Sequence, residues 1–482
     1  MNQVCVAKFG GTSVANAEAM GRCAQVVVAN PKTRVVVLSA SAGVTNLLVE
    51  LSQGALSTEE RQDRLQKLGT IQSNILNALG NPQPLTDTIN NMLDEVRELA
   101  EQACVASDAA LVDRMVAQGE LMSTRLFTEL MNQQGHKSVW FDVRKVMRTD
   151  SRFGKATPAI EALRTLAQQE MAPLLADHFV ITQGFIGANA EGQTTTLGRG
   201  GSDYSAALLA EALNVAELEI WTDVPGIYTT DPRMVKSARP IPEISFAEAA
   251  EMATFGAKVL HPSTLQPAVR RNIPVFVGSS KDPAAGGTWV RSSTESTPLF
   301  RAVALRRNQI LLTLQSPNML GACGFLAEVF SILTRHRISV DLITTSEVSV
   351  ALTLDHTGSQ SNGKSMLSDE VLAELGALCK VKVESDLALV ALIGNRMSEV
   401  SGAGTRVFDA IDDVSVRLIC YGASAHNLCF LVPENQAEDV IQRLHKKLLD
   451  EACSTPYQGA LPTGRAPFVF PAFAAFIPLL CC

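Results

Sequence analysis

The sequence Thr194-Thr195-Thr196-Leu197-Gly198-Arg199-Gly200-Gly201-Ser202-Asp203 joins an apolar run to a helical one. Residues 179–185 before it predict a buried strand, and residues 204–213 after it predict a helix with one apolar face. A strand, a loop of small residues and a helix present backbone N–H groups to an anion, the arginine adds a planar guanidinium, and the final serine or aspartate can cap the helix. The stretch contains neither G-x-x-x-x-G-K-[ST] nor the third glycine of G-x-G-x-x-G. By itself it therefore indicates either a tight turn with a capped helix or an anion site.

Length, charge and cysteine usage narrow the class of protein. The 482 residues are enough for two to four domains, and a net charge of −8 without a basic run argues against nucleic acid as the main partner. An acidic protein can still bind ATP, because local loops make a phosphate site. Ten cysteines without C-x-x-C pairs indicate free thiols, and the N-terminus shows no signal peptide, so we expect a cytoplasmic protein without a membrane partner. The seven histidines do not cluster, and we expect no metal held by protein ligands.

Two more strand–loop–helix units in the first sixty residues predict a doubly wound sheet whose loops gather at one edge. Lys8 ends the first strand, before Gly10-Gly11-Thr12-Ser13, where it can neutralise charge on a transferring phosphoryl group. A lysine beside a turn is, however, most often a surface residue. Residues 57–135 are mostly helical, and Glu120 near the start of an apolar helix indicates by itself only an acid that complements the helix dipole.

The second half of the chain contains an ordered loop, a boundary and a repeat. The prolines and glycine of residues 222–233 predict a fixed loop whose tyrosine and arginine can flank a nucleotide. Residues 279–297 are polar and rich in glycine and serine, which is typical of a domain boundary. Beyond them, a strand, a helix and a second strand recur at an offset of 76 to 78 residues, which predicts paired ferredoxin-like modules.

The last stretch, residues 451–482, differs from the rest of the chain. Its apolar end carries Pro467, Pro471 and Pro478, which interrupt any membrane-spanning helix. We expect a disordered tail or the product of a shifted reading frame, and assign it no function.

Lys8-Phe9-Gly10-Gly11-Thr12-Ser13-Val14 resembles the signature of the aspartokinases. Matching motifs follow in the family's order: Ser39-Ala40-Ser41-Ala42-Gly43-Val44-Thr45-Asn46, Gly119-Glu120-Leu121-Met122-Ser123, the stretch 194–203, and Thr222-Asp223-Val224-Pro225-Gly226-Ile227-Tyr228-Thr229-Thr230-Asp231-Pro232-Arg233. Together they span about residues 1–450 and are most similar to the bacterial monofunctional, lysine-sensitive type.

The resemblance implies an α/β fold. Residues 1–290 would form an amino-acid-kinase (carbamate-kinase-like) domain with a doubly wound sheet, and residues 300–450 two ferredoxin-like ACT regulatory domains. The first ACT domain would span about 311–385 and the second about 386–450, in tandem or interleaved.

The activity implied is the transfer of a phosphoryl group from ATP, carrying Mg²⁺, to the side-chain carboxylate of L-aspartate. The product, 4-phospho-L-aspartate, begins the route to lysine, threonine and methionine, and L-lysine would inhibit the enzyme through the ACT domains. A homo-oligomer is implied, a dimer or, with lysine, a tetramer. The chemistry agrees with the residues, because an ionised acceptor needs no strong base but needs cations and backbone amides to bring like charges together.

The resemblance also implies roles for individual residues. Lys8 and Asp203 would act in catalysis. Aspartate would be bound by Ser39, Thr45, Glu120, Arg199 and Ser202, with Arg199 on the α-carboxylate and Glu120 on the ammonium. The nucleotide would contact Lys8, Gly10, Gly11, Thr222, Asp223, Tyr228, Arg233 and Lys258.

Lysine would bind in the first ACT domain at a dimer interface. The matching positions are Met319, Phe325, Leu326, Ser339, Val340, Asp341, Thr345, Ser346 and Glu347. Gly321-Ala322-Cys323 lacks a serine hydroxyl expected there, so we expect weaker inhibition.

Two other functions remain open at the level of the sequence. One is an amino-acid kinase for glutamate, N-acetylglutamate or a nucleotide, against which the ACT-like repeat and the N-terminal signature argue. The other is a catalytically silent amino-acid sensor, against which Lys8, Arg199 and Asp203 argue. A bifunctional enzyme with a dehydrogenase domain is excluded by length, since few residues follow position 450.

Overall fold

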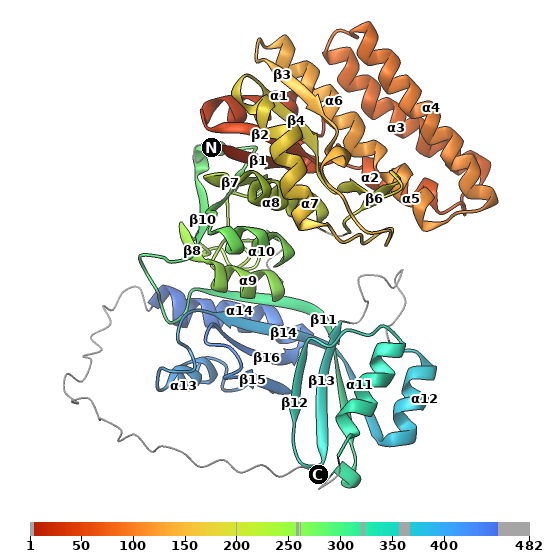
Figure 1. Ribbon diagram of the computed structural model, residues 1–482. Helices are drawn as coiled ribbons and strands as arrows, with labels where there is room; N and C mark the ends of the chain where they lie inside the picture. The colour runs from red at the N-terminus through yellow and green to blue at the C-terminus, as the bar shows by residue number, and fades with distance from the viewer. Residues whose placement is uncertain are drawn as a thin grey trace, which may run out of the picture.

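The computed structural model describes residues 4–198, 200–256, 260, 262–319, 323–355 and 367–451. They form two α/β units, the N-terminal one at the top of Figure 1 and the C-terminal one below it. The N-terminal unit is built around an eight-stranded sheet. In spatial order its strands are β3 (Ser138–Phe141), β4 (Phe179–Gln183), β2 (Thr33–Leu38), β1 (Cys5–Phe9), β7 (Glu217–Thr222), β9 (Val275–Ser279), β10 (Gly287–Arg291) and β8 (Glu243–Ser245).

Neighbouring strands of this sheet are parallel, except that β10 runs antiparallel to β9. Every residue of β1 is buried, as expected for a central parallel strand covered on both faces. Helices α1 and α6 pack near β2 and β4, while α7, α8 and α10 pack together near β1 and β7. The helices of this unit are α1 (Ala17–Ala29), α2 (Val44–Ser52), α3 (Thr58–Ala78), α4 (Gln83–Val105), α5 (Ala109–Val116), α6 (Gln118–Gln133), α7 (Ile160–Leu166), α8 (Gly201–Leu213), α9 (Phe246–Thr254) and α10 (Pro262–Arg271).

Two local predictions for this unit are wrong. Helix α8 is not capped by Ser202 or Asp203, because Gly200 is the N-cap residue at φ 74° with no side-chain capping bond. The helix therefore starts earlier than predicted, and both polar residues lie in its first turn. The polar stretch predicted as a boundary also contains β10, since Thr288 and Val290 are fully buried against the sheet.

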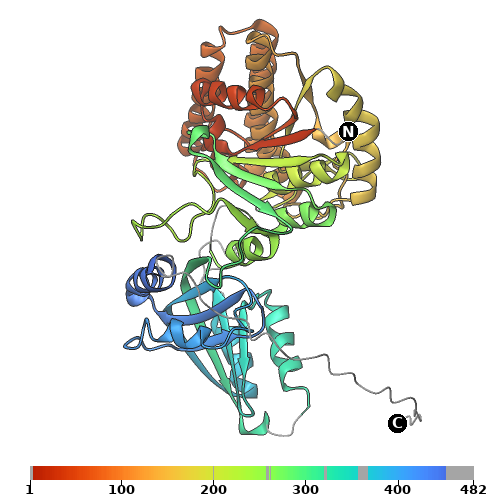
Figure 2. The same ribbon diagram turned by 90° about the vertical axis from the view of Figure 1, so that its left-hand side faces the viewer.

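The C-terminal unit is a six-stranded antiparallel sheet with helices on it (Figure 2). Its strands, in spatial order, are β12 (Leu342–Thr345), β13 (Ser349–Asp355), β11 (Ala302–Gln315), β14 (Lys380–Ile393), β16 (Asn427–Pro433) and β15 (Leu418–Tyr421). Its helices are α11 (Phe325–Arg335), α12 (Asp369–Leu378), α13 (Ala403–Phe408) and α14 (Ala437–His445). The predicted repeat corresponds to β11–α11–β12–β13 followed by β14–α13–β15–β16.

The two long central strands are each shared by two hydrophobic cores. On β11, Val303 packs into the core that holds α13 and α14, whereas Ile310 and Leu312 pack into the core that holds α11 and α12. On β14, Val390 and Leu392 belong to the former core, and Val381 packs against the latter. The two repeats are therefore interleaved along one continuous sheet.

Buried polar contacts join the two units. Glu248 of α9 is fully buried and accepts hydrogen bonds from Arg301 Nε (2.9 Å) and Asn395 Nδ2 (2.6 Å). His445, at the end of α14 and also fully buried, lies 2.8 Å from Thr229 Oγ1 in the loop after β7. No helix in the described ranges is both long and apolar enough to cross a membrane.

Candidate functional site

The carboxyl ends of four neighbouring strands meet at one edge of the eight-stranded sheet. Backbone hydrogen bonds join them: Ser39 N–H donates to Phe9 O (3.2 Å), Gly184 N–H to Leu38 O (2.9 Å) and Gly10 N–H to Trp221 O (3.2 Å). Ligands of open α/β sheets bind at this edge, because the loops there leave backbone groups exposed to a crevice. The predicted catalytic residues lie along it.

Lys8 and Asp203 form an ion pair at this edge. Lys8 Nζ lies 2.5 Å from Asp203 Oδ1, and the two side chains are only 10% and 18% exposed. The position that a Cβ would take on Gly10 lies 3.7 Å from Lys8 Nζ, so the glycine leaves the ammonium group open from that side. The lysine is thus a held cation beside a glycine turn rather than a surface residue.

Three glycines allow the loops of the site to touch. A Cβ on Gly11 would lie 2.8 Å from Ala40 O, and one on Gly119 would lie 2.7 Å from Ala40 Cβ. A Cβ on Gly184 would lie 2.6 Å from Ser202 Cβ. Any side chain at these positions would push the strand ends and helices apart, so the glycines set the width of the site.

Glu120 is a buried acid that the protein leaves half satisfied. Its residue is 3% exposed, Oε1 accepts a hydrogen bond from Ala40 N–H at 3.1 Å, and Oε2 has no partner among the described residues. Burial raises the pKa of Glu120 to about 8, against the backbone N–H groups of Ala40 and of Glu120 itself, which favour the carboxylate. A buried carboxylate oxygen without a donor fits a ligand that brings one, such as an ammonium group.

The remaining predicted substrate residues surround this acid. Ser39 follows β2 and accepts a hydrogen bond at its carbonyl from Ser123 Oγ (2.9 Å), and Thr45 lies half-buried in the first turn of α2. Sequence reasoning gave no role to Ser41, whose hydroxyl is fully buried and has no partner among the described residues. The one sequence feature that could have identified Ser41 is its position in the motif that follows β2. Arg199 lies outside the described residues.

Four of the predicted nucleotide residues line one pocket of about 810 Å³. They are Thr222, Asp223, Tyr228 and Arg233, and the opposite wall comes from residues 303–308 of β11. Lys258, the fifth residue predicted there, lies outside the described residues. The pocket therefore lies between the loop after β7 and a strand of the C-terminal unit.

The loop around this pocket is held in shape. Gly226 has φ 98°, and a Cβ there would lie 2.6 Å from Thr288 Oγ1, which receives the N–H of Ile227 at 2.8 Å. Arg233 is 88% exposed and pairs with Asp231 at 2.6 Å, so its guanidinium is positioned but accessible. The prediction of an ordered loop is confirmed.

Asp113 of α5 is a positioning residue that sequence reasoning missed. It is 2% exposed and accepts hydrogen bonds from Gly154 N–H and from both Thr196 N–H and Thr196 Oγ1 at 2.8 Å. Burial raises the pKa of Asp113. It fixes the end of β6 (Thr194–Thr196), immediately before the glycine loop that starts α8. An acid inside an amphipathic helix gives no sign of this in the sequence.

The predicted effector residues separate into two groups within one chain. Asp341 precedes β12 and its N–H donates to Thr353 O, whereas Glu347 lies in the turn after β12. At about 3.3 Å per residue, the two acids are about 15–20 Å apart. Met319 lies near Glu347, at the end of β12. Ser316 N–H donates to Val348 O, beside Glu347, and Met319 N–H donates to Ser316 O. Ser339 and Val340 are next to Asp341, and Thr345 and Ser346 are next to Glu347.

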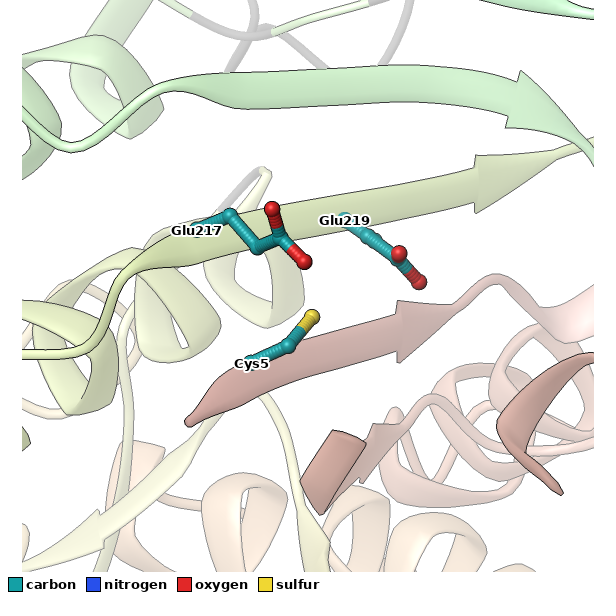
Figure 3. A group of neighbouring side chains, drawn as sticks. All are labelled: Cys5, Glu217 and Glu219. Carbon is teal, nitrogen blue, oxygen red and sulfur yellow. The ribbon is translucent and has the colours of Figure 1, made fainter. Parts of the chain in front are cut away.

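One further cluster of possible ligand groups lies at the opposite end of the sheet (Figure 3). Cys5 of β1 and Glu217 and Glu219 of β7 point toward one another, with their ligand atoms within 4.8 Å. Protein donors already hold both carboxylates: Asn30 Nδ2 reaches each, and Trp221 Nε1 donates to Glu219 at 2.9 Å. We therefore explain the cluster as internal hydrogen bonding and propose no metal there.

Comparisons with family models and with known proteins agree on one family. The sequence matches the amino acid kinase family over residues 3–279 and an ACT domain family over residues 390–448. It is 60% identical to lysine-sensitive aspartokinase 3 of Escherichia coli K12 over 450 residues, which are 93% of this chain and 100% of that protein.

Two crystal structures of E. coli aspartokinase III, both 60% identical, are similar over nearly the whole chain. The complex with aspartate and ADP in the R-state gives a TM-score of 0.85 and covers 92% of this chain and 99% of that one. The complex with lysine and aspartate in the T-state gives 0.80, covering 93% and 100%.

Proposed function

Because this chain belongs to the aspartokinase family and is an ATP-dependent aspartate kinase, we propose that Lys8, Asp203 and Glu120 carry its reaction at the carboxyl edge of the eight-stranded sheet. The observation that supports this most strongly is the buried Oε2 of Glu120, which has no hydrogen-bond partner within the part of the chain that the structure describes. L-Aspartate brings an ammonium group that can donate to it. An analogue without that group would leave the buried acid unpaired, which is a strong basis for rejection.

The acceptor carboxylate of aspartate is ionised at neutral pH, so catalysis consists of holding two anions in line. Lys8 stabilises the charge of the transferring phosphoryl group, and Asp203 holds the lysine in place through their 2.5 Å ion pair. Gly10 lies beside the ammonium group and contributes no side chain that would block the approach of phosphate oxygens.

The other predicted contacts complete the two substrate sites. Arg199 grips the α-carboxylate of aspartate in bidentate fashion, with Ser39, Thr45 and Ser202 as hydrogen-bonding groups. ATP lies in the pocket lined by Thr222, Asp223, Tyr228 and Arg233, with Lys258 as a further predicted contact of the nucleotide. The pocket opens beside the carboxyl end of β7, next to β1, which carries Lys8.

Mg²⁺ enters on ATP and neutralises phosphate charge when bound. Asp203, the carboxylate paired with Lys8, would be the protein group that holds such an ion, because it remains partly exposed at 18%. A metal held by phosphates, waters and one carboxylate needs no cage of protein ligands.

L-Lysine inhibits through the first ACT repeat, and we place its site between two copies of the chain. Asp341 and Glu347 lie too far apart in one chain to hold the same lysine molecule, so each would meet it from a different subunit. This supports a homodimer, and a tetramer in the presence of lysine stays a prediction from the resemblance. The cytoplasmic location and the absence of nucleic-acid and membrane partners remain predictions.

The test is ADP release measured with purified protein, ATP and Mg²⁺, with and without aspartate and lysine. We expect release to require aspartate and to fall with lysine. Arg199→Ala should raise the KM for aspartate much more than the KM for ATP, whereas Arg152→Ala, a 73% exposed arginine outside the site, should change neither. Equal losses for both substrates would move Arg199 to the nucleotide.

A further inference from the structure

Strand β11 has an irregularity where it passes from one repeat to the other. Its pairing with β14 shifts register between Arg306 and Gln309, and Asn308 adopts φ 58°. A bulge of this kind re-aims side chains and bends a strand. Here it turns the arginine side chain toward the start of β12 and leaves the strand backbone at the wall of the nucleotide pocket.

Arg306 is the counter-ion of Asp341, the acid that we assign to the binding site of the effector L-lysine. Its Nη1 lies 3.2 Å from Asp341 Oδ1, and its Nη2 pairs with Asp355. The side chains of the arginine and of Asp341 are only 24% and 22% exposed. Burial raises the pKa of Asp341, although the guanidinium opposes this. One guanidinium thus neutralises two carboxylates, so the pair keeps a net negative charge that can attract a second cation.

The same arginine lies against the nucleotide pocket. Arg306 and Leu305 are among the residues that line it. Gly256, at the end of α9, is so close that a Cβ on it would lie 2.6 Å from Leu305 O and 3.7 Å from Arg306 Cβ. Gly256 stands two residues before Lys258, which is predicted to contact the nucleotide. A shift of Arg306 would therefore move the backbone that adjoins this segment.

We propose that Arg306 is the positioning residue through which lysine acts on nucleotide binding: the ammonium group of lysine replaces its guanidinium at Asp341. In the lysine-free state Arg306 bridges Asp341 and Asp355 and holds residues 305–308 against Gly256. When lysine binds Asp341, the guanidinium of Arg306 pairs with Asp355 alone, and residues 305–308 of the pocket wall are no longer held in place. The ligand shifts the equilibrium because it binds the released state better. This inference rests on the proposed assignment of Asp341 to the lysine site.

The test separates lysine binding from lysine action. Lysine affinity is measured by calorimetry on the full chain, and the KM for ATP is measured with and without saturating lysine. In Arg306→Gln we expect lysine to bind about tenfold tighter, because its competitor for a half-buried carboxylate is gone. We expect lysine to leave the KM for ATP within about twofold of its lysine-free value in that variant. Arg396→Gln removes an exposed arginine that lies outside the pocket and pairs with Glu399 at 2.8 Å, and it should keep the wild-type response to lysine.

Two results would overturn the proposal: a wild-type response of KM to lysine in Arg306→Gln, or a parallel loss of lysine affinity and inhibition, which would indicate a merely structural role. Should Arg306→Gln not fold, Arg306→Lys keeps the charge but cannot bridge two carboxylates. The Arg306→Lys variant should bind lysine a few-fold tighter, and lysine should change its KM for ATP less than in the wild type. If neither quantity changes, the role proposed for Arg306 is rejected. Asp341→Asn tests the underlying assignment separately, since normal lysine binding by that variant would remove Asp341 from the effector site.

Discussion

The buried acid Glu120 makes aspartate binding a proton-releasing event. With a pKa of about 8, Glu120 is about nine-tenths protonated at pH 7 in the free enzyme. Pairing with the substrate ammonium favours the carboxylate, so binding should release about 0.9 proton per aspartate at that pH. Because ionisation must precede pairing, the dissociation constant should rise as the pH falls, by about 50-fold from pH 8 to pH 6.

Calorimetry in buffers of different ionisation enthalpy measures the protons released. Wild-type protein is compared with Glu120→Gln, which keeps the shape and cannot ionise. Glu129→Gln serves as a control, because that acid lies on the same helix and accepts a hydrogen bond from the exposed side chain of Gln133. We expect proton release from the wild type and the control but not from Glu120→Gln, whose aspartate affinity should be low and nearly independent of pH. Equal proton release by all three proteins would refute the reasoning.

The same shift has a consequence for stability without ligand. The folded state holds the proton of Glu120 up to about pH 8, whereas the unfolded chain loses it near pH 4.5. The folded state therefore binds more protons between these values, and its stability falls as the pH rises through that window. Urea unfolding should show Glu120→Gln gaining stability relative to wild type at about pH 8.5 and gaining little at about pH 5. A constant difference at both pH values would contradict a raised pKa.

Three other substitutions test the architecture. Lys8→Met should lower kcat by about 10²-fold or more with the fold intact, because the cation acts as charge shifts in the transition state; a loss of a few-fold would remove Lys8 from catalysis. Gly119→Ala should raise the KM for aspartate, since its Cβ would lie 2.7 Å from Ala40 Cβ and displace the donor to Glu120; unchanged kinetics would mean that the loop yields freely. Arg301→Met should destabilise the protein by about 3–5 kcal/mol in urea unfolding, because Glu248 is left fully buried without its cation, whereas loss of the exposed Arg22–Glu18 pair in Arg22→Met should cost under about 1 kcal/mol.

Much of the fold could be predicted because its signals are local. The apolar runs of β1 and β2, the glycine turns after β1 and before α8, and the strand–helix–strand repeat each lie within a few residues of one another. The doubly wound sheet and the regulatory repeat are confirmed by the strand order and by the family matches. Strand β10 was missed because it has only five residues within a polar, glycine- and serine-rich stretch, and its burial comes from its neighbours.

The parts of the site that escaped prediction depend on distant contacts. Asp113 and Arg306 have ordinary sequence surroundings, and only folding brings them to Thr196 and to Asp341. The capping prediction failed because α8 already begins at Gly201, and Asp203 in its first turn pairs instead with Lys8 from a strand almost two hundred residues earlier. Residue type and spacing identify groups able to do chemistry, whereas partners far along the chain decide which of them do it.

The sharing of β11 between two cores limits how this protein can be divided or recombined. A fragment beginning at residue 386 would lack Val303 and the strand segment that pairs with residues 389–393, so the second ACT repeat would expose an unpaired, apolar flank. A fragment ending near residue 380 would remove the partner of residues 309–315. The two repeats therefore cannot be exchanged one at a time between relatives. Sensitivity to a different amino acid would have to be transplanted as the whole of residues 299–450, or evolve by substitution in place.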